Sequence, residues 1–463
     1  MAVLGTLATA LCPGGAPAGA DSPSPRLSEA PGADTARAPF VRPPVSRLRA
    51  RRSALMDSVG SGSVVLPSAR LRDLETEYLQ ASDFRQDNDF LYLTGLLTPN
   101  SWLVLSSGPG GTERAVVFVP AADSARSRWT GALPSREEIS RRSGIDEVRS
   151  TAEFERMVRA DSLELLLGPG PLHVPRGPRR GGRELVRLLA EGVAGDSVGP
   201  SAPGPVRDAR PLLARLRLVK DEFELRMLRE AVAVTGSGIR RALRRVRPGD
   251  WEYEVEAEAE YAFRRRGALR VGFPSIVGSG PNSVVLHYDD SRRRTGDGDL
   301  VVMDVGAEYS HYTADVTRTF PVSGTFTDRQ REVYRLVLGS LRAALDAVRP
   351  GATLADVGTV AREYMRAHSD GLCGERSCER FFDHGVGHWL GMDVHDVGEY
   401  GTPFRPGMVL TVEPGVYLRD EGLGIRIEED VLVTESGREV LSADIPRRPK
   451  EIERLMAERP PGR

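Results

Sequence analysis

The feature that most constrains this chain is a set of acidic residues placed within or beside apolar runs of its second half. Asp304, for example, directly follows the run Leu300-Val301-Val302-Met303. A carboxylate in such a position is costly to bury unless it is paired with a cation or bound to a metal ion. Each acid taken alone is also explained as a strand-edge charge or a salt-bridge partner. Four such acids in one half of the chain predict a shared site, and they are Asp304, Asp315, Glu413 and Glu428.

A histidine-rich segment, His384-Gly385-Val386-Gly387-His388, lies between the second and third of these acids. Four carboxylates carry four negative charges, which two divalent cations would neutralise. Oxygen ligands with one imidazole suit Mn²⁺, Co²⁺ or Fe²⁺ better than a structural zinc ion, which prefers thiolates. Two ions roughly 3.5–4 Å apart can share a bridging water and lower its pKa. The pattern therefore predicts a hydrolase with two divalent metal ions; Mn²⁺ is favoured, and Co²⁺, Fe²⁺ and Zn²⁺ are alternatives.

The length of 463 residues predicts two folded domains with flanking segments. Apolar runs at 101–105 and 115–119 predict buried strands, and Arg183–Leu189 predicts part of a helix. The Pro- and Gly-rich stretch Gly199–Pro205 is typical of a domain boundary. The predicted parts are a signal peptide and disordered linker (1–45), a smaller α/β N-terminal domain (46–208), a catalytic domain (209–445) and a C-terminal tail (446–463).

One helix pattern occurs twice in the second half. Amphipathic helices are predicted over Asp221–Arg247 and Glu252–Arg266, with Pro-Gly at 248–249 between them. A capping box at Thr327 opens a second pair of helices, again separated by Pro-Gly, at 350–351. This recurrence indicates an internal duplication, with chance recurrence of a turn motif as the alternative. Strand pairs follow both helix pairs, so we expect an α+β fold with a curved antiparallel sheet backed by helices.

Five segments of the second half resemble the metal-ligand motifs of the pita-bread metallopeptidases, in family order and with compatible spacing. Within that family the chain is most similar to the Xaa-Pro aminopeptidases, because residues 83–90 (DFRQDNDF) resemble that group's amino-terminal motif. The resemblance covers roughly residues 45–445. It implies a C-terminal pita-bread fold, a homo-oligomer, and peptide substrates with proline at position 2, cleaved before that proline. The five segments are Asp299–Gly306, Ala314–Pro321, His384–Asp396, Thr411–Gly415 and Gly424–Asp430.

The resemblance also implies a role for each metal ligand. Asp304 would bind one ion, and His388 with Glu413 would bind the other. Asp315 and Glu428 would bridge the two ions. Glu413 would in addition relay a proton from the bridging water, as a base beside the nucleophile that it activates.

Three histidines and an arginine complete the site that the resemblance implies. His395 would donate to the scissile carbonyl oxygen or to the oxyanion. His287 and His384 match histidines on the proline side, and Arg426 matches an arginine that supports this pocket; a purely structural role is the alternative for these three. An imide nitrogen before proline carries no N–H, so a pocket shaped for the ring must recognise it, with Tyr288 near its walls. The candidate catalytic residues are Glu413, His395 and His287.

Three other functions use related scaffolds. A prolidase has the same fold and ligands but cleaves only Xaa-Pro dipeptides, and a closed, cationic end to its site would capture the dipeptide carboxylate. Methionine aminopeptidases usually lack a folded N-terminal domain of this size. Metal-free binding proteins and creatinase-like hydrolases lose metal ligands, whereas this chain retains all five. An Xaa-Pro aminopeptidase therefore remains the preferred interpretation.

Charge and composition limit the partners and the compartment. The net charge is −2 and the arginines are spread along the chain, so nothing indicates nucleic-acid binding. No run of about 20 apolar residues occurs, so no membrane span is expected. The apolar stretch Ala2–Leu11, followed by Ala18-Gly19-Ala20, favours export over a cytoplasmic enzyme with a disordered extension. Cys373 and Cys378 flank a polar loop and form either a small disulfide or two separate thiols.

Overall fold

The computed structural model describes residues 40–71, 84–107, 113–124, 127–128, 131–159, 166–167, 170–175 and 204–458. The predicted signal peptide, the predicted linker up to residue 39 and the helix predicted at Arg183–Leu189 lie outside these residues. The first described helix, α1 (Val45–Val59), begins at the end of the predicted linker.

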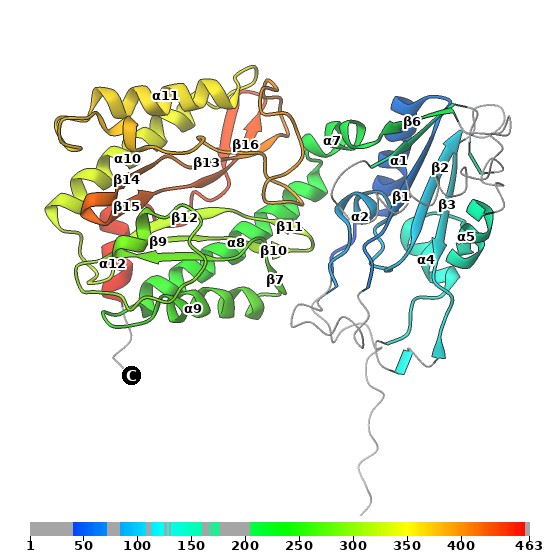
Figure 1. Ribbon diagram of the computed structural model, residues 1–463, viewed down its shortest axis with the longest axis horizontal. Helices are drawn as coiled ribbons and strands as arrows, with labels where there is room; N and C mark the ends of the chain where they lie inside the picture. The colour runs from blue at the N-terminus through cyan, green and yellow to red at the C-terminus, as the bar shows by residue number, and fades with distance from the viewer. Residues whose placement is uncertain are drawn as a thin grey trace, which may run out of the picture. The chain divides into compact units, whose positions relative to one another are not determined.

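The N-terminal domain is built on a six-stranded mixed sheet in the order β4-β3-β2-β1-β5-β6 (Figure 1). The three strands in the middle of this order, β3, β2 and β1, pair antiparallel, while β4, β5 and β6 join in parallel. The strands expected around 101–105 and 115–119 are confirmed as β2 and β3. The strand bounds are β1 Ser63–Pro67, β2 Trp102–Ser107, β3 Glu113–Val119, β4 Glu147–Ser150, β5 Pro171–Val174 and β6 Gly204–Asp208.

Alternate residues of these strands enter two separate apolar cores. Val64, Leu103 and Val117 pack on the side of α1, α2 (Asn88–Thr94) and α4 (Arg136–Ser143). Their neighbours Val65 and Val104 pack on the other side, against α5 (Thr151–Arg159). Successive side chains of a strand point to opposite faces, so a sheet covered on both faces has apolar residues at every position. The expectation of an α/β domain is confirmed.

The Pro- and Gly-rich stretch predicted as a domain boundary, Gly199–Pro205, lies mostly outside the described residues. Gly204 and Pro205 open β6, the last strand of the N-terminal sheet, which ends at Asp208, the last residue expected for the first domain. Proline is tolerated there because an edge strand leaves one row of N–H groups unpaired. Helix α7 (Arg210–Leu218) follows and leads into the second domain.

Two helix pairs frame the catalytic domain. The first is α8 (Glu222–Arg245) with α9 (Glu252–Arg265), and the second is α10 (Asp328–Ala347) with α11 (Leu354–Ala367). The capping box predicted at Thr327 is present, and its hydroxyl accepts from the Gln330 N–H. The predicted Pro-Gly stops recur in both connections, where Gly249 and Gly351 adopt φ of 91° and 86°. A left-handed backbone of this kind favours glycine.

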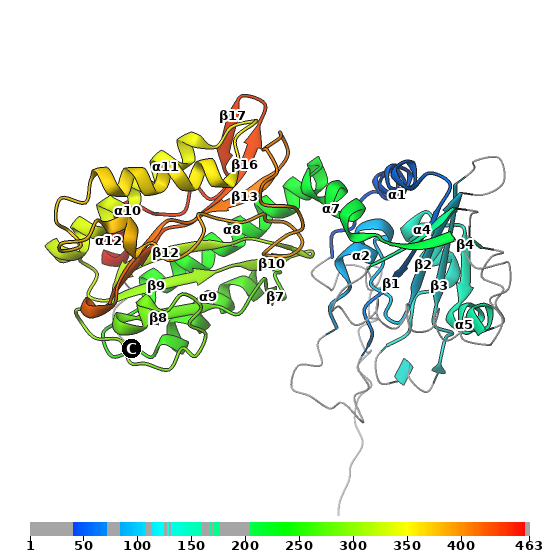
Figure 2. The ribbon, with the colours of Figure 1, turned by 45° about the horizontal axis from the view of Figure 1, so that its top comes forward.

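The strands of this domain lie between the helix pairs, with α10 and α11 on one side and α8 and α9 on the other (Figures 1 and 2). All pairing is antiparallel, as expected, and the strands divide into four hydrogen-bonded sheets: β12-β9-β8, β11-β10-β7, β13-β16-β17 and β14-β15. Their bounds are β7 Arg270–Val271, β8 Ile276–Ser279, β9 Leu300–Val305, β10 Ala307–Tyr309, β11 Tyr312–Thr313, β12 Val316–Pro321, β13 Val409–Val412, β14 Gly415–Leu418, β15 Leu423–Arg426, β16 Glu429–Thr434 and β17 Gly437–Val440.

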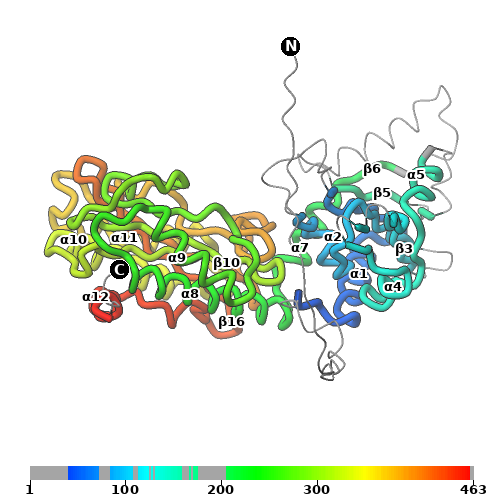
Figure 3. Tube along the Cα trace, turned by 90° about the horizontal axis from the view of Figure 1, so that it is seen from below, coloured from blue at the N-terminus to red at the C-terminus, as the bar shows by residue number. Residues whose placement is uncertain are grey.

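The segment predicted as a C-terminal tail (446–463) contains a packed helix. Helix α12 (Pro449–Ala457) lies beside α8 (Figure 3), and an ion pair of 3.0 Å joins Arg244 to Glu458. Ile452 and Met456 are buried in the core of the catalytic domain. Apolar residues spaced four apart on a helix share one face, and this face makes the segment part of the domain. Among the described residues, no helix has both the length and the apolar character that crossing a membrane requires.

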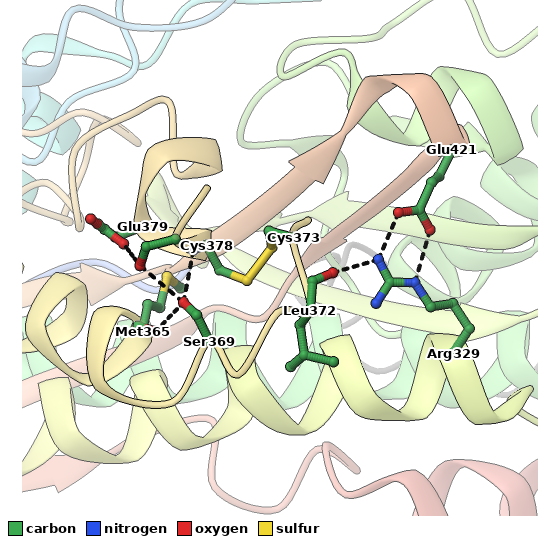
Figure 4. The surroundings of a disulfide bond; sticks show 9 residues. Arg329, Met365, Ser369, Leu372, Cys373, Cys378, Glu379 and Glu421 are labelled. Atoms are coloured by element: carbon green, nitrogen blue, oxygen red, sulfur yellow. Dashed lines mark hydrogen bonds and ion pairs between the residues drawn. A yellow bond between two sulfur atoms is a disulfide. The ribbon is translucent and has the colours of Figure 1, made fainter. Parts of the chain in front are cut away.

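Cys373 and Cys378 form a disulfide in the connection between α11 and the short helix η4 (Cys378–Phe381) (Figure 4). The Ser369 hydroxyl donates to the Met365 carbonyl and accepts from the Cys378 N–H, at 2.7 and 2.8 Å. The alternative of two separate thiols is therefore wrong for this structure.

Candidate metal centre

Strands β9 and β12 bring the first two acids together. Asp304 lies opposite Thr317 in the antiparallel register, and Asp315 immediately precedes β12. Thr317 also connects this hairpin to the third acid: its carbonyl accepts from the Glu428 N–H at 3.2 Å and its hydroxyl donates to Glu428 Oε2 at 2.7 Å. The side chains of these acids are buried, so the sheet carries the cluster in its interior.

The histidine segment runs alongside β13, which ends just before Glu413. The Glu413 N–H donates to the Val386 carbonyl at 2.8 Å, and the Thr411 N–H donates to the His388 carbonyl at 2.9 Å. Gly387 allows this close approach, because a Cβ at that position would lie 1.9 Å from the Thr411 carbonyl oxygen. The backbone pairing thus brings His388 and Glu413 to the same place.

The ligand atoms converge. His388 Nε2 lies 3.2 Å from Asp315 Oδ2 and 3.9 Å from Glu413 Oε1. Among the residues that the structure describes, Asp315, His388 and Glu428 form the one group of three metal-binding side chains whose ligand atoms all lie within 4.8 Å of one another. Asp304 approaches from the side of Arg426, whose Nη2 is 2.8 Å from Asp304 Oδ2.

The crowded carboxylates repel one another electrostatically. Burial, with the charge of Glu428 next, raises the pKa of both Asp315 and Glu413 well above the usual range. Burial and the charge of Asp304 raise the pKa of Glu428 to about 8. Without a countercharge these groups would therefore hold protons near neutral pH.

His388 is arranged as a neutral ligand. Burial, with the neighbouring His395 next, lowers the pKa of His388 to about 4. Its Nδ1 lies 3.1 Å from the Trp389 carbonyl, which can only accept, so Nδ1 carries the proton. Nε2 then presents a lone pair toward Asp315, in the tautomer that a metal ligand requires.

The residues fit a pair of divalent cations. Asp304 Oδ1 and Asp315 Oδ1 are buried and accept no hydrogen bond from any described residue. Unpaired buried carboxylate oxygens are rare, because desolvation costs several kcal/mol per charge. Two divalent ions would satisfy both oxygens and balance the four negative charges. Oxygen donors with one imidazole also suit hard or borderline cations, whereas a structural zinc ion is usually bound by thiolates.

A cavity of about 910 Å³ opens onto this cluster. Each of the nine residues predicted for the site lines this cavity: His287, Asp304, Asp315, His384, His388, His395, Glu413, Arg426 and Glu428. The His395 ring stacks on His388 with centroids 4.0 Å apart. Burial, with His287 next, lowers the pKa of His395, and burial with Arg426 next lowers the pKa of His384 to about 4. His384, His388 and His395 therefore line the cavity in their neutral form at neutral pH.

Tyr288 is not among the cavity-lining residues, so its prediction as part of the proline pocket is wrong. Its hydroxyl donates to Glu252 at 2.8 Å instead. Sequence reasoning also missed Tyr417. The Tyr417 hydroxyl contacts His384 Nε2 at 2.8 Å and accepts from Arg426 at 3.0 Å. No local pattern marks Tyr417, since its role depends on partners from two other segments.

Comparison with known proteins agrees with this geometry. Residues 226–435 match the model of metallopeptidase family M24, and residues 48–163 match the N-terminal domain of aminopeptidase P. The chain is 36% identical over 432 residues to an Xaa-Pro aminopeptidase of Escherichia coli, covering 88% of this chain and 96% of that protein. This chain belongs to metallopeptidase family M24. Within family M24 it is also 32% identical over 402 residues to human Xaa-Pro aminopeptidase 3, covering 81% of this chain and 77% of the human protein.

Solved structures of M24 peptidases show the same fold. E. coli aminopeptidase P with the inhibitor Pro-Leu superposes with a TM-score of 0.81 at 34% identity, covering 90% of this chain and 99% of that one. A zinc-substituted form of the E. coli enzyme in complex with product gives 0.82, covering 91% and 100%. The pita-bread fold expected for the catalytic domain is confirmed, and the family implies divalent metal ions.

Proposed function

We propose that this M24 peptidase removes the first residue from peptides whose second residue is proline. The observation that carries the proposal is the convergence of three buried acids, one half-buried acid and a neutral imidazole on one open cavity. The curated relatives named Xaa-Pro aminopeptidase, which span nearly the whole chain, support the same activity.

We assign the metal ligands as the resemblance implies. Asp304 would hold one ion, His388 and Glu413 would hold the other, and Asp315 and Glu428 would contribute ligands to both. When bound, the two divalent ions, which we propose to be Mn²⁺, supply Lewis-acid polarisation and a water of lowered pKa. Tight convergence around His388 Nε2 and the unpaired oxygens of Asp304 and Asp315 support this assignment.

Glu413 and His395 handle the proton and the developing charge. Glu413 Oε1 lies 3.9 Å from His388 Nε2, so this carboxylate would stand beside the attacking water and could accept its proton. His395 lines the cavity and burial lowers its pKa, so its neutral ring could donate an N–H to the carbonyl oxygen as negative charge develops there. A donor placed in this way lowers the barrier most when it is held still.

Recognition of proline is assigned to the wall around His287 and His384. Arg426 connects the two: its guanidinium donates to the Leu286 carbonyl beside His287, and to the Tyr417 hydroxyl that contacts His384. Arg426 thus connects and stabilises the two sides of this wall. Such a wall recognises the pyrrolidine ring by shape, which suits a scissile imide without an N–H.

The charges that line the cavity favour an aminopeptidase over a prolidase. Among the described lining residues the arginines are Arg362 and Arg426, and there is no lysine. Arg362 donates to the carbonyls of Phe382 and His384 at 2.8 and 2.7 Å, and Arg426 pairs with Asp304. Both cations are engaged within the protein, which argues against capture of a dipeptide carboxylate and favours longer peptides.

The test is cleavage of three peptides by the metal-loaded protein: Ala-Pro-Ala, Ala-Pro and Ala-Ala-Ala. We expect release of alanine from Ala-Pro-Ala at the highest kcat/KM, abolished by a chelator and by Asp315→Asn. Cleavage of Ala-Pro alone would make the protein a prolidase. Equal cleavage of Ala-Ala-Ala would remove the proline specificity, and no cleavage of any peptide would overturn the proposal.

We also propose export to an oxidising compartment and assembly as a homo-oligomer. The Cys373–Cys378 disulfide supports the first, because disulfides persist mainly outside the reducing cytosol. Subcellular fractionation of the producing cells and sedimentation equilibrium of the purified protein test the two proposals separately; a cytoplasmic fraction or a monomer would contradict them.

A further inference from the structure

The loop that carries His395 is attached to a network of buried charges. Arg217, at the end of α7, contacts three aspartates: Asp89 at 2.6 Å, Asp393 at 2.9 Å and Asp396 at 2.6 Å. Lys220 Nζ lies 3.0 Å from the second oxygen of Asp396. The side chains of Arg217, Lys220 and Asp396 are each only 1% exposed. We call these five side chains the Arg217 hub.

The hub holds a short loop that begins directly after His388 and contains His395 near its end. Residues 389–396 follow His388 directly and include His395, and Asp396 is the next residue along the chain. Both carboxylate oxygens of Asp396 are held, one by Arg217 and the other by Lys220. Its N–H also donates to the Trp389 carbonyl at 2.9 Å. The peptide that joins His395 to Asp396 is therefore fixed on its C-terminal side.

The N-terminal domain holds the middle of the same loop. Arg85 and Asn88 both donate to the Met392 carbonyl, at 3.0 and 3.2 Å. Asp89, in the same helix as Asn88, supplies the third carboxylate around Arg217. These residues belong to the motif at 83–90, of which residues 84–90 are described. The motif thus connects the first domain to the loop that bears His395.

We propose that Arg217 is a positioning residue for His395. The proposal rests on the proposed function, in which His395 donates to the substrate oxygen. A planar guanidinium can span several carboxylates at fixed angles, which a single ammonium cannot. By linking Asp89 to Asp393 and Asp396, Arg217 holds the loop against the first domain. A donor displaced by about 1 Å can cost on the order of 10²-fold in rate, so the hub controls kcat through His395.

The first experiment compares Arg217→Met with Arg51→Met in the metal-loaded enzyme. Arg51 is a matched control, because it is also buried and pairs with two acids, Asp221 and Glu224, but does not contact the loop. We expect Arg217→Met to lower kcat by about 10- to 100-fold, as lost supporting contacts do at other sites, with KM little changed. Arg51→Met should lower stability without this loss of kcat per folded molecule.

A double-mutant cycle with His395→Ala separates positioning from general damage. If Arg217 acts through His395, Arg217→Met will cost little more once His395 is absent, whereas unrelated effects multiply. The same factor in both backgrounds would overturn the proposal. Should Arg217→Met not fold, Asp89→Asn takes its place, because it removes only one of the three contacts.

Hydrogen exchange of residues 389–396 keeps this test independent of the proposed function. Faster exchange in Arg217→Met than in Arg51→Met, each relative to the wild type, supports the hub even if no Xaa-Pro peptide is cleaved. If Arg217→Met leaves exchange in that loop unchanged, Arg217 does not hold the loop. This result would overturn the proposal even if the wild type is a fully active Xaa-Pro aminopeptidase.

Discussion

The catalytic domain contains two buried acidic regions, one around Glu428 and one around Glu429. Comparing them distinguishes acids that stabilise the fold from acids that are available to bind a ligand. Glu428 and Glu429 are adjacent in the chain, yet Glu428 meets Thr317 while Glu429 meets the next residue, Arg318. Successive residues of an extended chain point to opposite faces, so the two glutamates enter different environments.

The environment of Glu429 is closed. Its carboxylate accepts from Arg318 and Arg447, both at 3.0 Å, and from Ser442. The environment of Glu428 is open: it lies among other carboxylates, two of which, Asp304 and Asp315, keep an unpaired oxygen. Buried charge that the protein itself neutralises is structural. Buried charge that it leaves unneutralised marks a site for a ligand of opposite sign.

The largest expected effect comes from altering the open cluster. Glu413→Gln should lower kcat/KM by about 10³-fold, because it removes the proposed base and one charged ligand. The free energy of unfolding of the metal-stripped protein should stay equal or rise, since one of several repelling buried charges is gone. Peptide cleavage and denaturant unfolding measure the two effects. A stripped variant that is much less stable than the stripped wild type would break the distinction between the two regions.

For the region around Glu429 we expect a loss of stability without a loss of metal binding. Glu429→Gln leaves the buried guanidinium of Arg318 without its charged partner, and breaking a buried pair in this way costs about 3–5 kcal/mol. Urea unfolding of the loaded protein checks this loss. Bound metal per folded chain should remain at the wild-type value. Loss of metal with unchanged stability would show that Glu429 belongs to the site.

Once the metal is removed, the acids around Glu428 should make the stability of the protein depend on pH. In the stripped folded protein the pKa values of Asp315, Glu413 and Glu428 are raised above their unfolded values, near 4. The folded state then binds more protons than the unfolded state, so this contribution is present at low pH and is lost as the pH rises through the folded pKa values. From pH 5 to pH 8, the Tm of the stripped protein should fall relative to the loaded protein by ~5 °C. A constant difference would contradict the assigned repulsion.

The smallest effect is expected outside both regions. Replacing Cys373 and Cys378 by serine opens a short covalent loop, which costs roughly 2 kcal/mol on the chain-entropy estimate. Since neither cysteine lines the cavity or contacts either acidic region, kcat/KM should remain near the wild-type value. Thermal unfolding with parallel kinetics measures both. A large fall in kcat would show that this loop influences the site after all.

The local features of the catalytic domain were predictable because each rests on a short stretch of sequence. The capping box at Thr327 and the Pro-Gly turns define the helix ends, and interrupted apolar runs mark the acids. Two segments that were not predicted as a strand or a helix carry mixed patterns. β6 begins with Gly-Pro, which normally indicates a turn, and α12 is charged on all but one face.

Contacts between distant segments could not be predicted in this way. Arg217 reaches partners that lie 128, 176 and 179 residues away, so no local spacing reveals the hub. The same holds for Tyr417, and for the hydrogen bonds that Arg362 and Arg426 make within the protein. Each depends on the packing of the whole domain.

The most direct test of the account is anomalous diffraction from crystals soaked in MnCl₂. We expect two manganese peaks roughly 3.5–4 Å apart. One should be bound by Asp304, the other by His388 and Glu413, and both by Asp315 and Glu428. Peaks elsewhere, or a single ion that leaves Asp304 or His388 without a metal contact, would contradict the central claim that these five side chains form a two-metal site.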